Sequence, residues 1–122
     1  MTEGRKEFEA QLQALGYTPD QRPDERTSFP YPIPCGPFAG EQVRLGVEVP
    51  ADFPRTPPGG IHLSPRVLPI NSQAPSHPER VHESPFGADW EYWSRPMAQF
   101  WTKTDRSVKA YMDYVASLFA RL

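Results

Sequence analysis

The chain has 122 residues, enough to close one hydrophobic core and too few for two, so the sequence predicts a single domain over 1–122. Its formal net charge is -2 and its Lys and Arg residues form no basic run, which argues against nucleic acid as a partner. No apolar run approaches the length of a membrane span, the N-terminus lacks an apolar signal core, and one cysteine cannot form an internal disulfide. We therefore expect a soluble, cytoplasmic protein that binds no membrane.

The N-terminal segment predicts a helix over residues 4–15. Phe8, Leu12 and Leu15 recur at helical spacing, and Gly16 stands where a helix C-cap is expected. The 16 prolines fall mostly in the middle of the chain and leave both ends nearly free, which favours a helix at each end with a proline-punctuated sheet and loops between them.

The middle of the chain predicts three strands. Residues 29–34 read as an edge strand, because their prolines exclude a central position, and residues 35–40 read as a hairpin loop. Residues 41–50 form the clearest strand, and 61–65 a shorter one. The alternating apolar residues of the longer strand are Val43, Leu45, Val47 and Val49. Residues 66–96 show no sustained period, and we expect mostly loop there.

The C-terminal segment, 105–122, predicts the second helix. Its apolar residues recur at i, i+3, i+4 and i+7, with Thr104 or Asp105 positioned as the N-cap. They are Val108, Tyr111, Met112, Val115, Leu118, Phe119 and Leu122. The order of elements predicts an α+β domain in which the helices pack on one face of an antiparallel meander.

The order of several short motifs resembles the ubiquitin-conjugating (E2) family. A strand, a "YPxxPP"-like turn, a second strand, an "HP" pair and a "WSRP" segment before a helix follow one another as in that family. The matching residues are Phe53, Pro54, Pro57 and Pro58, then His77 and Pro78, then Trp93, Ser94 and Pro96. The resemblance covers about residues 4–122, is closest to the bacterial group called prokaryotic E2 family E, and implies a UBC-like fold with a long active-site loop.

The chain departs from the family pattern at the reactive position. Glu79 replaces the asparagine of the family's "HPN" motif, and Ser84 and Pro85 stand at the distance before Trp93 where the family has its cysteine. The chain also ends after the helix that follows "WSRP", so we expect the last two helices of the family to be absent.

Two residues are candidate nucleophiles. Cys35 falls in the predicted 35–40 hairpin, away from the expected groove, and we interpret it as a packing residue. Ser84 occupies the position that the resemblance assigns to the acceptor, and Pro85 favours an extended conformation for it. Residues two apart in extended chain project to the same side, so His82 is the candidate general base. The alternative is a serine that only stabilises a loop beside a surface histidine.

Other candidates are binding or loop residues. By resemblance His77 belongs to the active-site loop, where it either takes part in the chemistry or bonds loop backbone. With His82 and Glu83 it makes an incomplete metal set, so we predict no metal site. Trp90 and Trp93 either form core and groove wall or face a partner.

The N-terminal helix has a charged face that includes Arg5, Lys6 and Glu9. By resemblance this face either docks an activating enzyme or is simply solvated.

The resemblance implies an E2-like carrier in a bacterial pathway that conjugates a ubiquitin-like protein. An E1-like adenylating enzyme would deliver the C-terminus of that protein, Ser84 would hold it as an oxyester, and an isopeptidase of the same operon is an expected further partner. No cofactor is expected on the domain, because ATP is consumed upstream. The alternatives are a catalytically silent E2 variant that binds a ubiquitin-like protein and, with less support, a hydrolase using Ser84 and His82, for which no orienting acid or glycine-flanked nucleophile turn is visible.

Overall fold

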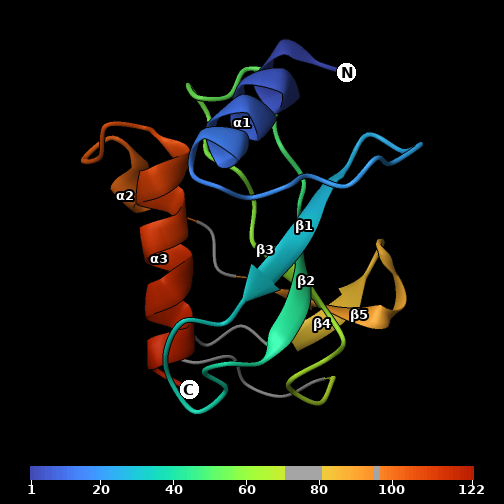
Figure 1. The fold of residues 1–122 in the computed structure, drawn as a ribbon. Helices are drawn as coiled ribbons and strands as arrows, with labels where there is room; N and C mark the ends of the chain where they lie inside the picture. Colours follow the sequence, from blue (N-terminus) through green and yellow to red (C-terminus); the bar gives the residue numbers. More distant parts are fainter. Residues whose placement is uncertain (71–80, 95–96) are drawn as a thin grey trace.

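The computed structural model describes residues 1–70, 81–94 and 97–122, and these form an α+β arrangement of helices and one antiparallel sheet (Figure 1). The elements in chain order are α1 (Glu3–Ala14), β1 (Thr27–Pro32), β2 (Gln42–Val47), β3 (Ile61–Ser64), β4 (Val81–Ser84), β5 (Gly87–Trp93), α2 (Ala98–Trp101) and α3 (Val108–Ala120). The sheet has five strands in the order β1-β2-β3-β5-β4. No helix within the described ranges combines the length and apolar character needed to cross a membrane.

Helix α1 confirms the predicted N-terminal helix to within one residue at each end. The Thr2 side chain accepts a hydrogen bond from the Arg5 amide at the N-terminus. Gly16 has φ of 98°, and the amides of Gly16 and Tyr17 bond the carbonyls of Gln13 and Leu12. This is a Schellman ending, which a side chain at position 16 would strain.

The first three strands confirm the predicted meander with shifted boundaries. β1 pairs antiparallel with β2, placing Phe29 opposite Leu45, and β2 pairs with β3, placing Leu45 opposite Leu63. These three side chains are fully buried on one sheet face. β2 is shorter than the predicted 41–50 strand, and pairing ends before Pro50, which has no amide hydrogen to donate.

The prediction of loop over most of 66–96 is wrong, because residues 81–93 form the β4–β5 hairpin. Glu91 faces the buried side and is 0% exposed, which breaks the alternation expected for a strand. Its carboxylate accepts hydrogen bonds from the backbone amides of Val67 (2.9 Å) and Leu68 (3.1 Å). Burial raises the pKa of Glu91, while these amide bonds act against the rise. The carboxylate thus ties the chain after β3 to the hairpin.

Helix α3 packs the predicted apolar stripe against the sheet. The ring of Phe119 contacts Tyr31 of β1 and Trp93 of β5, at centroid distances of 5.8 and 5.2 Å. Figure 1 shows α3 along one side of the sheet, with the turn of the β4–β5 hairpin pointing away from it. The ring of Phe8 in α1 packs on Tyr111, so both helices contribute to one core.

The start of α3 differs from the prediction. The helix begins at Val108 and its N-cap is Ser107, whose side chain accepts a hydrogen bond from the Ala110 amide. Asp105 instead accepts from the amide and hydroxyl of Ser107, and Thr104 bonds the preceding turn. The caps predicted from the sequence were Thr104 and Asp105 but not Ser107, although a serine also favours the N-cap position.

The core assignment predicts a large stability loss when α3 is truncated on its buried face. Val115→Ala or Leu118→Ala should lower the free energy of unfolding by about 1–4 kcal/mol, because each loses transfer energy and leaves a cavity. Urea unfolding at neutral pH measures the change. The control Asp113→Ala removes an exposed side chain paired with Lys109 and should cost under about 0.5 kcal/mol. Unchanged midpoints for both truncations would contradict the assignment.

Candidate active site

Ser84 ends β4 and contacts a histidine that the sequence analysis did not select. Its Oγ lies 2.7 Å from Nδ1 of His62, a residue of β3, which β5 separates from β4 in the sheet. The same Oγ accepts a hydrogen bond from the Phe86 amide at 3.1 Å. The strand register shifts between Glu83 and Ser84, directly before the turn of the β4–β5 hairpin. Ser84 itself is half-buried, so its hydroxyl combines partial access with a contact to a base.

The histidine in contact with Ser84 is therefore His62, whereas the sequence predicted His82. His82 is exposed and lies opposite Tyr92 in the strand register, with ring centroids 6.1 Å apart. The register shifts between these two residues: His82 lies opposite Tyr92, whereas Ser84 lies opposite Gly87 at the hairpin turn.

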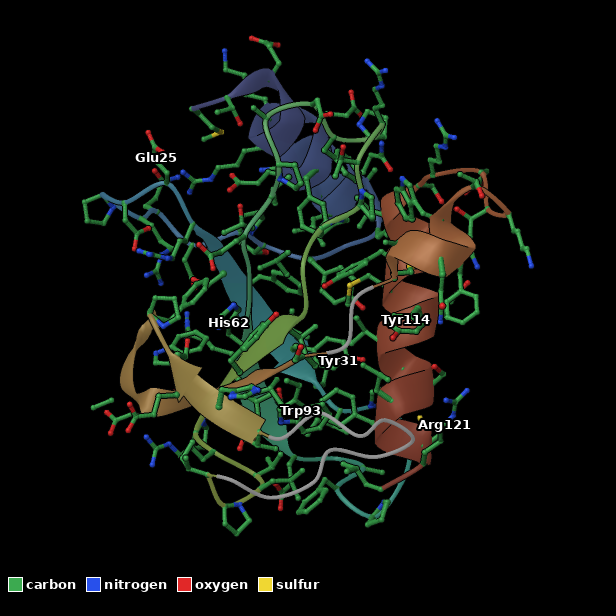
Figure 2. All side chains as sticks on the ribbon, turned by 180° about the vertical axis from the view of Figure 1, so that it is seen from behind. Glu25, Tyr31, His62, Trp93, Tyr114 and Arg121 are labelled. Carbon is green, nitrogen blue, oxygen red and sulfur yellow. The ribbon has the colours of Figure 1, made fainter. Side chains whose placement is uncertain are left out.

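His62 lies in β3 between aromatic rings on the sheet face opposite the core. It is paired in register with Gly46 and Tyr92, and it is 2% exposed. The rings of Phe86 and Tyr92 each lie with their centroid 4.5 Å from that of the imidazole. Figure 2 shows His62 near the β4–β5 hairpin, on the side of the sheet away from α3. Burial and the charge of Arg26 lower the pKa of His62 to about 4, so the ring is neutral near pH 7.

Phe86 at the tip of the hairpin covers this outer face. Its ring lies directly over Gly46, where an added Cβ would come within 2.6 Å of Cε2. Arg22, on the segment before β1, places its guanidinium 4.9 Å from the centroid of the Phe86 ring. The centroid of the Trp90 ring lies at the same distance from that of Phe86. A small residue at position 46 is thus what lets the hairpin close down and bring Ser84 to His62.

Charged groups lie at the second nitrogen of the imidazole. Oε1 of Glu48 is 3.8 Å from Nε2 of His62, and Oε2 of Glu48 is 3.6 Å from Nε of Arg26. Beside them is an open hollow of about 470 Å³ whose lining includes Asp24, Glu25 and Val49. The geometry suits transfer of the Ser84 proton to a neutral imidazole, the step that activates a serine as nucleophile.

The two predicted binding tryptophans have different positions. Trp90 is half-buried against Phe86, and its carbonyl accepts from Arg66. Trp93 is 0% exposed and packs on Phe119, so it belongs to the core and cannot face a partner.

Arg5 is likewise not part of an exposed docking face, because it is 6% exposed. Its guanidinium donates to Glu9, to Thr27 and to the carbonyls of Asp24 and Arg26, joining α1 to the start of β1. Lys6 is exposed and pairs with Glu3 at 3.3 Å.

Cys35 has the packing role expected for it. It lies between β1 and β2, and its thiol donates to the Ala116 carbonyl of α3 at 3.3 Å. His77 and Glu79 lie outside the described residues. Within the described ranges, no group of three or more His, Cys, Asp or Glu side chains is arranged to hold a metal ion.

His62 and Glu48 are not among the site residues predicted from the sequence. A signal for His62 was present, because in the strand Ile61-His62-Leu63 the histidine must face away from the two core residues. Glu48 carried no comparable signal, since it directly follows β2 at the surface and meets His62 only through the pairing of β2 with β3.

Comparisons with known proteins found no matching family model, no similar curated protein and no similar solved structure.

The cover of Phe86 over Gly46 predicts a specific coupling. Gly46→Ala should lower the free energy of unfolding by about 1–3 kcal/mol, because the ring must move to admit the methyl group. In a Phe86→Ala background the same substitution should cost much less, giving a measurable interaction energy in a double-mutant cycle.

Gly59→Ala is the matched control, since a Cβ there meets nothing within 4 Å. Equal costs of Gly46→Ala in the two backgrounds would show that Phe86 does not cover this position.

The depressed pKa of His62 predicts acid sensitivity. The unfolded chain binds a proton at this residue near pH 6.5 and the folded protein only near pH 4, so stability is fully present above pH 6.5 and falls as the pH drops toward 4. The loss attributable to His62 should be roughly 3 kcal/mol by linkage.

Urea unfolding of wild type and His62→Gln between pH 7 and 4 measures this loss as a difference between the two proteins, which cancels the titration of carboxylates. Parallel pH profiles would mean that His62 is protonated equally easily in both states.

Proposed function

We propose that this chain is an E2-like carrier in a bacterial pathway that conjugates a ubiquitin-like protein, with Ser84 as the acceptor. The observation that carries the proposal is the 2.7 Å contact between Oγ of the half-buried Ser84 and Nδ1 of His62. The order of motifs in the sequence, and the succession of helix, antiparallel sheet and helix, are those expected of a UBC-like domain. An E1-like adenylating enzyme is the donor partner, and the pathway operates in the cytoplasm, where ATP is available.

In the proposed reaction Oγ of Ser84 attacks the carbonyl carbon of a thioester carried by the E1-like enzyme. The hydroxyl proton moves to Nδ1 of His62, the Oγ–C bond forms, the C–S bond breaks, and the departing thiolate takes the proton from the imidazole. An amine then attacks the carbonyl carbon of the oxyester, the C–N bond forms, the C–Oγ bond breaks, and a proton of the amine passes through His62 to Oγ. The domain itself requires no cofactor for either step.

A second candidate function is a binding module for the ubiquitin-like protein without covalent transfer. It is favoured by the low pKa of His62, because a base works best when its pKa lies near the working pH. It is also favoured by the amide of Phe86, which occupies one acceptor site of the Ser84 hydroxyl in the turn.

Covalent loading distinguishes the two candidates. Wild type incubated with ATP and with the E1-like enzyme and ubiquitin-like protein of the same genome should form an adduct that resists thiol reductants and is cleaved by hydroxylamine. Ser84→Ala should form none, and Ser84→Cys should form one that reductant cleaves. His62→Gln should slow loading about 10²–10⁴-fold if His62 is the general base. Intact-mass spectrometry measures each species.

Two variants serve as controls. His82→Gln alters an exposed histidine with no contact to Ser84 among the hydrogen bonds described, and Cys35→Ser retains a donor for the Ala116 carbonyl, so both should load normally. If wild type and Ser84→Ala bind the ubiquitin-like protein equally and neither is loaded, the binding module replaces the carrier.

A further inference from the structure

Glu48 stands on the opposite side of the His62 ring from Ser84. Nδ1 of the imidazole contacts the serine at 2.7 Å, and Nε2 lies 3.8 Å from Oε1 of Glu48. The three residues come from β4, from β3 and from the position directly after β2. Because β5 lies between β3 and β4 in the sheet, Ser84 reaches His62 through a side-chain contact and not through strand pairing. The Glu48 side chain is 54% exposed and that of His62 is 3% exposed. The row therefore runs from solvent, through a buried imidazole, to a half-buried hydroxyl.

The function of such a row depends on the proton of the neutral imidazole. A proton on Nδ1 would be donated to Oγ of Ser84, and the ring could not then accept the hydroxyl proton. A proton on Nε2 leaves Nδ1 free as the acceptor. A carboxylate beside Nε2 attracts an N–H at that position, so Glu48 favours the tautomer that can act as a base toward Ser84.

We propose that Glu48 is the positioning residue for acyl transfer to Ser84, completing a Ser84–His62–Glu48 row of nucleophile, base and orienting acid. This inference rests on the proposed role of Ser84 as acceptor. As the serine proton moves to Nδ1, the imidazole becomes positive, and the carboxylate at Nε2 stabilises that charge. The arrangement supplies the orienting acid that the sequence did not reveal, and it follows the logic of serine nucleophiles on unrelated folds.

Arg26 opposes Glu48 in this arrangement. Its Nε lies 3.6 Å from Oε2 of Glu48, and it is the positive group that disfavours the imidazolium. The remaining faces of His62 are covered by the rings of Phe86 and Tyr92. Among the residues that the structure describes, Glu48 is therefore the carboxylate close enough to His62 to offset the charge of Arg26 during transfer.

The tautomer is the first readout, because a purely structural role of Glu48 would not move it. Nitrogen-15 NMR of the imidazole at pH 7 should show His62 of the wild type protonated on Nε2. Glu48→Gln should shift the population toward the Nδ1–H form. Glu25→Gln is the matched control. Glu25 is an exposed carboxylate that lines the same surface hollow as Glu48, and its removal should leave the tautomer unchanged.

Labelling of Ser84 by a fluorophosphonate is the second readout. In this reaction the Oγ–P bond forms, the P–F bond breaks, fluoride leaves, and the hydroxyl proton passes to His62 and then to solvent. Labelling of wild type should map to Ser84 and be absent in Ser84→Ala. Glu48→Gln should slow it by about tenfold or more while Glu25→Gln leaves the rate unchanged.

Three results would overturn the inference: an Nδ1–H tautomer in the wild type, failure of the fluorophosphonate to label wild-type Ser84, or an unchanged tautomer and rate in Glu48→Gln. A failure of the proposed carrier function would give a different combination of results. A labelled, Glu48-dependent Ser84 that never loads the ubiquitin-like protein refutes the carrier and supports the role of Glu48. Loading that is insensitive to Glu48→Gln refutes that role and supports the carrier.

Discussion

The packing of Phe86 over Gly46 is the contact on which the outer face of the sheet depends. The ring can reach β2 because position 46 has no side chain, and once there it stacks on His62 and draws the end of β4 inward. Ser84 arrives next to the imidazole as a result. The hairpin tip therefore acts as an apolar cover and as the means of positioning the candidate nucleophile, so packing and chemistry are not separable here.

This cover has an electrostatic consequence for His62. Removing the imidazole from water favours its neutral form, and Arg26 adds to that preference. A neutral ring can accept a proton from Ser84 but holds it weakly. Glu48 is the nearby charge of opposite sign, and its distance from Nε2 is small enough to matter to a transient imidazolium. The apolar surroundings of His62 therefore disfavour its protonation, whereas the partly exposed carboxylate of Glu48 favours it.

A second carboxylate secures the hairpin from the core side. Glu91 points inward, where an apolar residue would ordinarily stand, and the amides of Val67 and Leu68 satisfy it. The neighbouring Trp93 packs against Phe119 of α3. The hairpin is therefore attached on both of its faces, by a polar anchor and core packing on one and by Phe86 on the other, which explains how a strand at the edge of the sheet can hold Ser84 in place.

The sequence by itself determined the helices and strands that show a regular spacing of apolar residues within one short segment. The i, i+3, i+4 spacing predicted α3 and its core face, and alternation predicted β2 and β3. Such a pattern needs only nearby residues, because it reflects the burial of one face of a single helix or strand. It also supplied Ser84 as a candidate. Only the tertiary structure decided the partner of Ser84. The contact of Ser84 with His62 forms only when β3, β5 and β4 assemble into one sheet, and Glu48 comes near His62 through the pairing of β2 with β3. These are contacts between residues far apart in the chain, and no local pattern specifies which side chains they bring together.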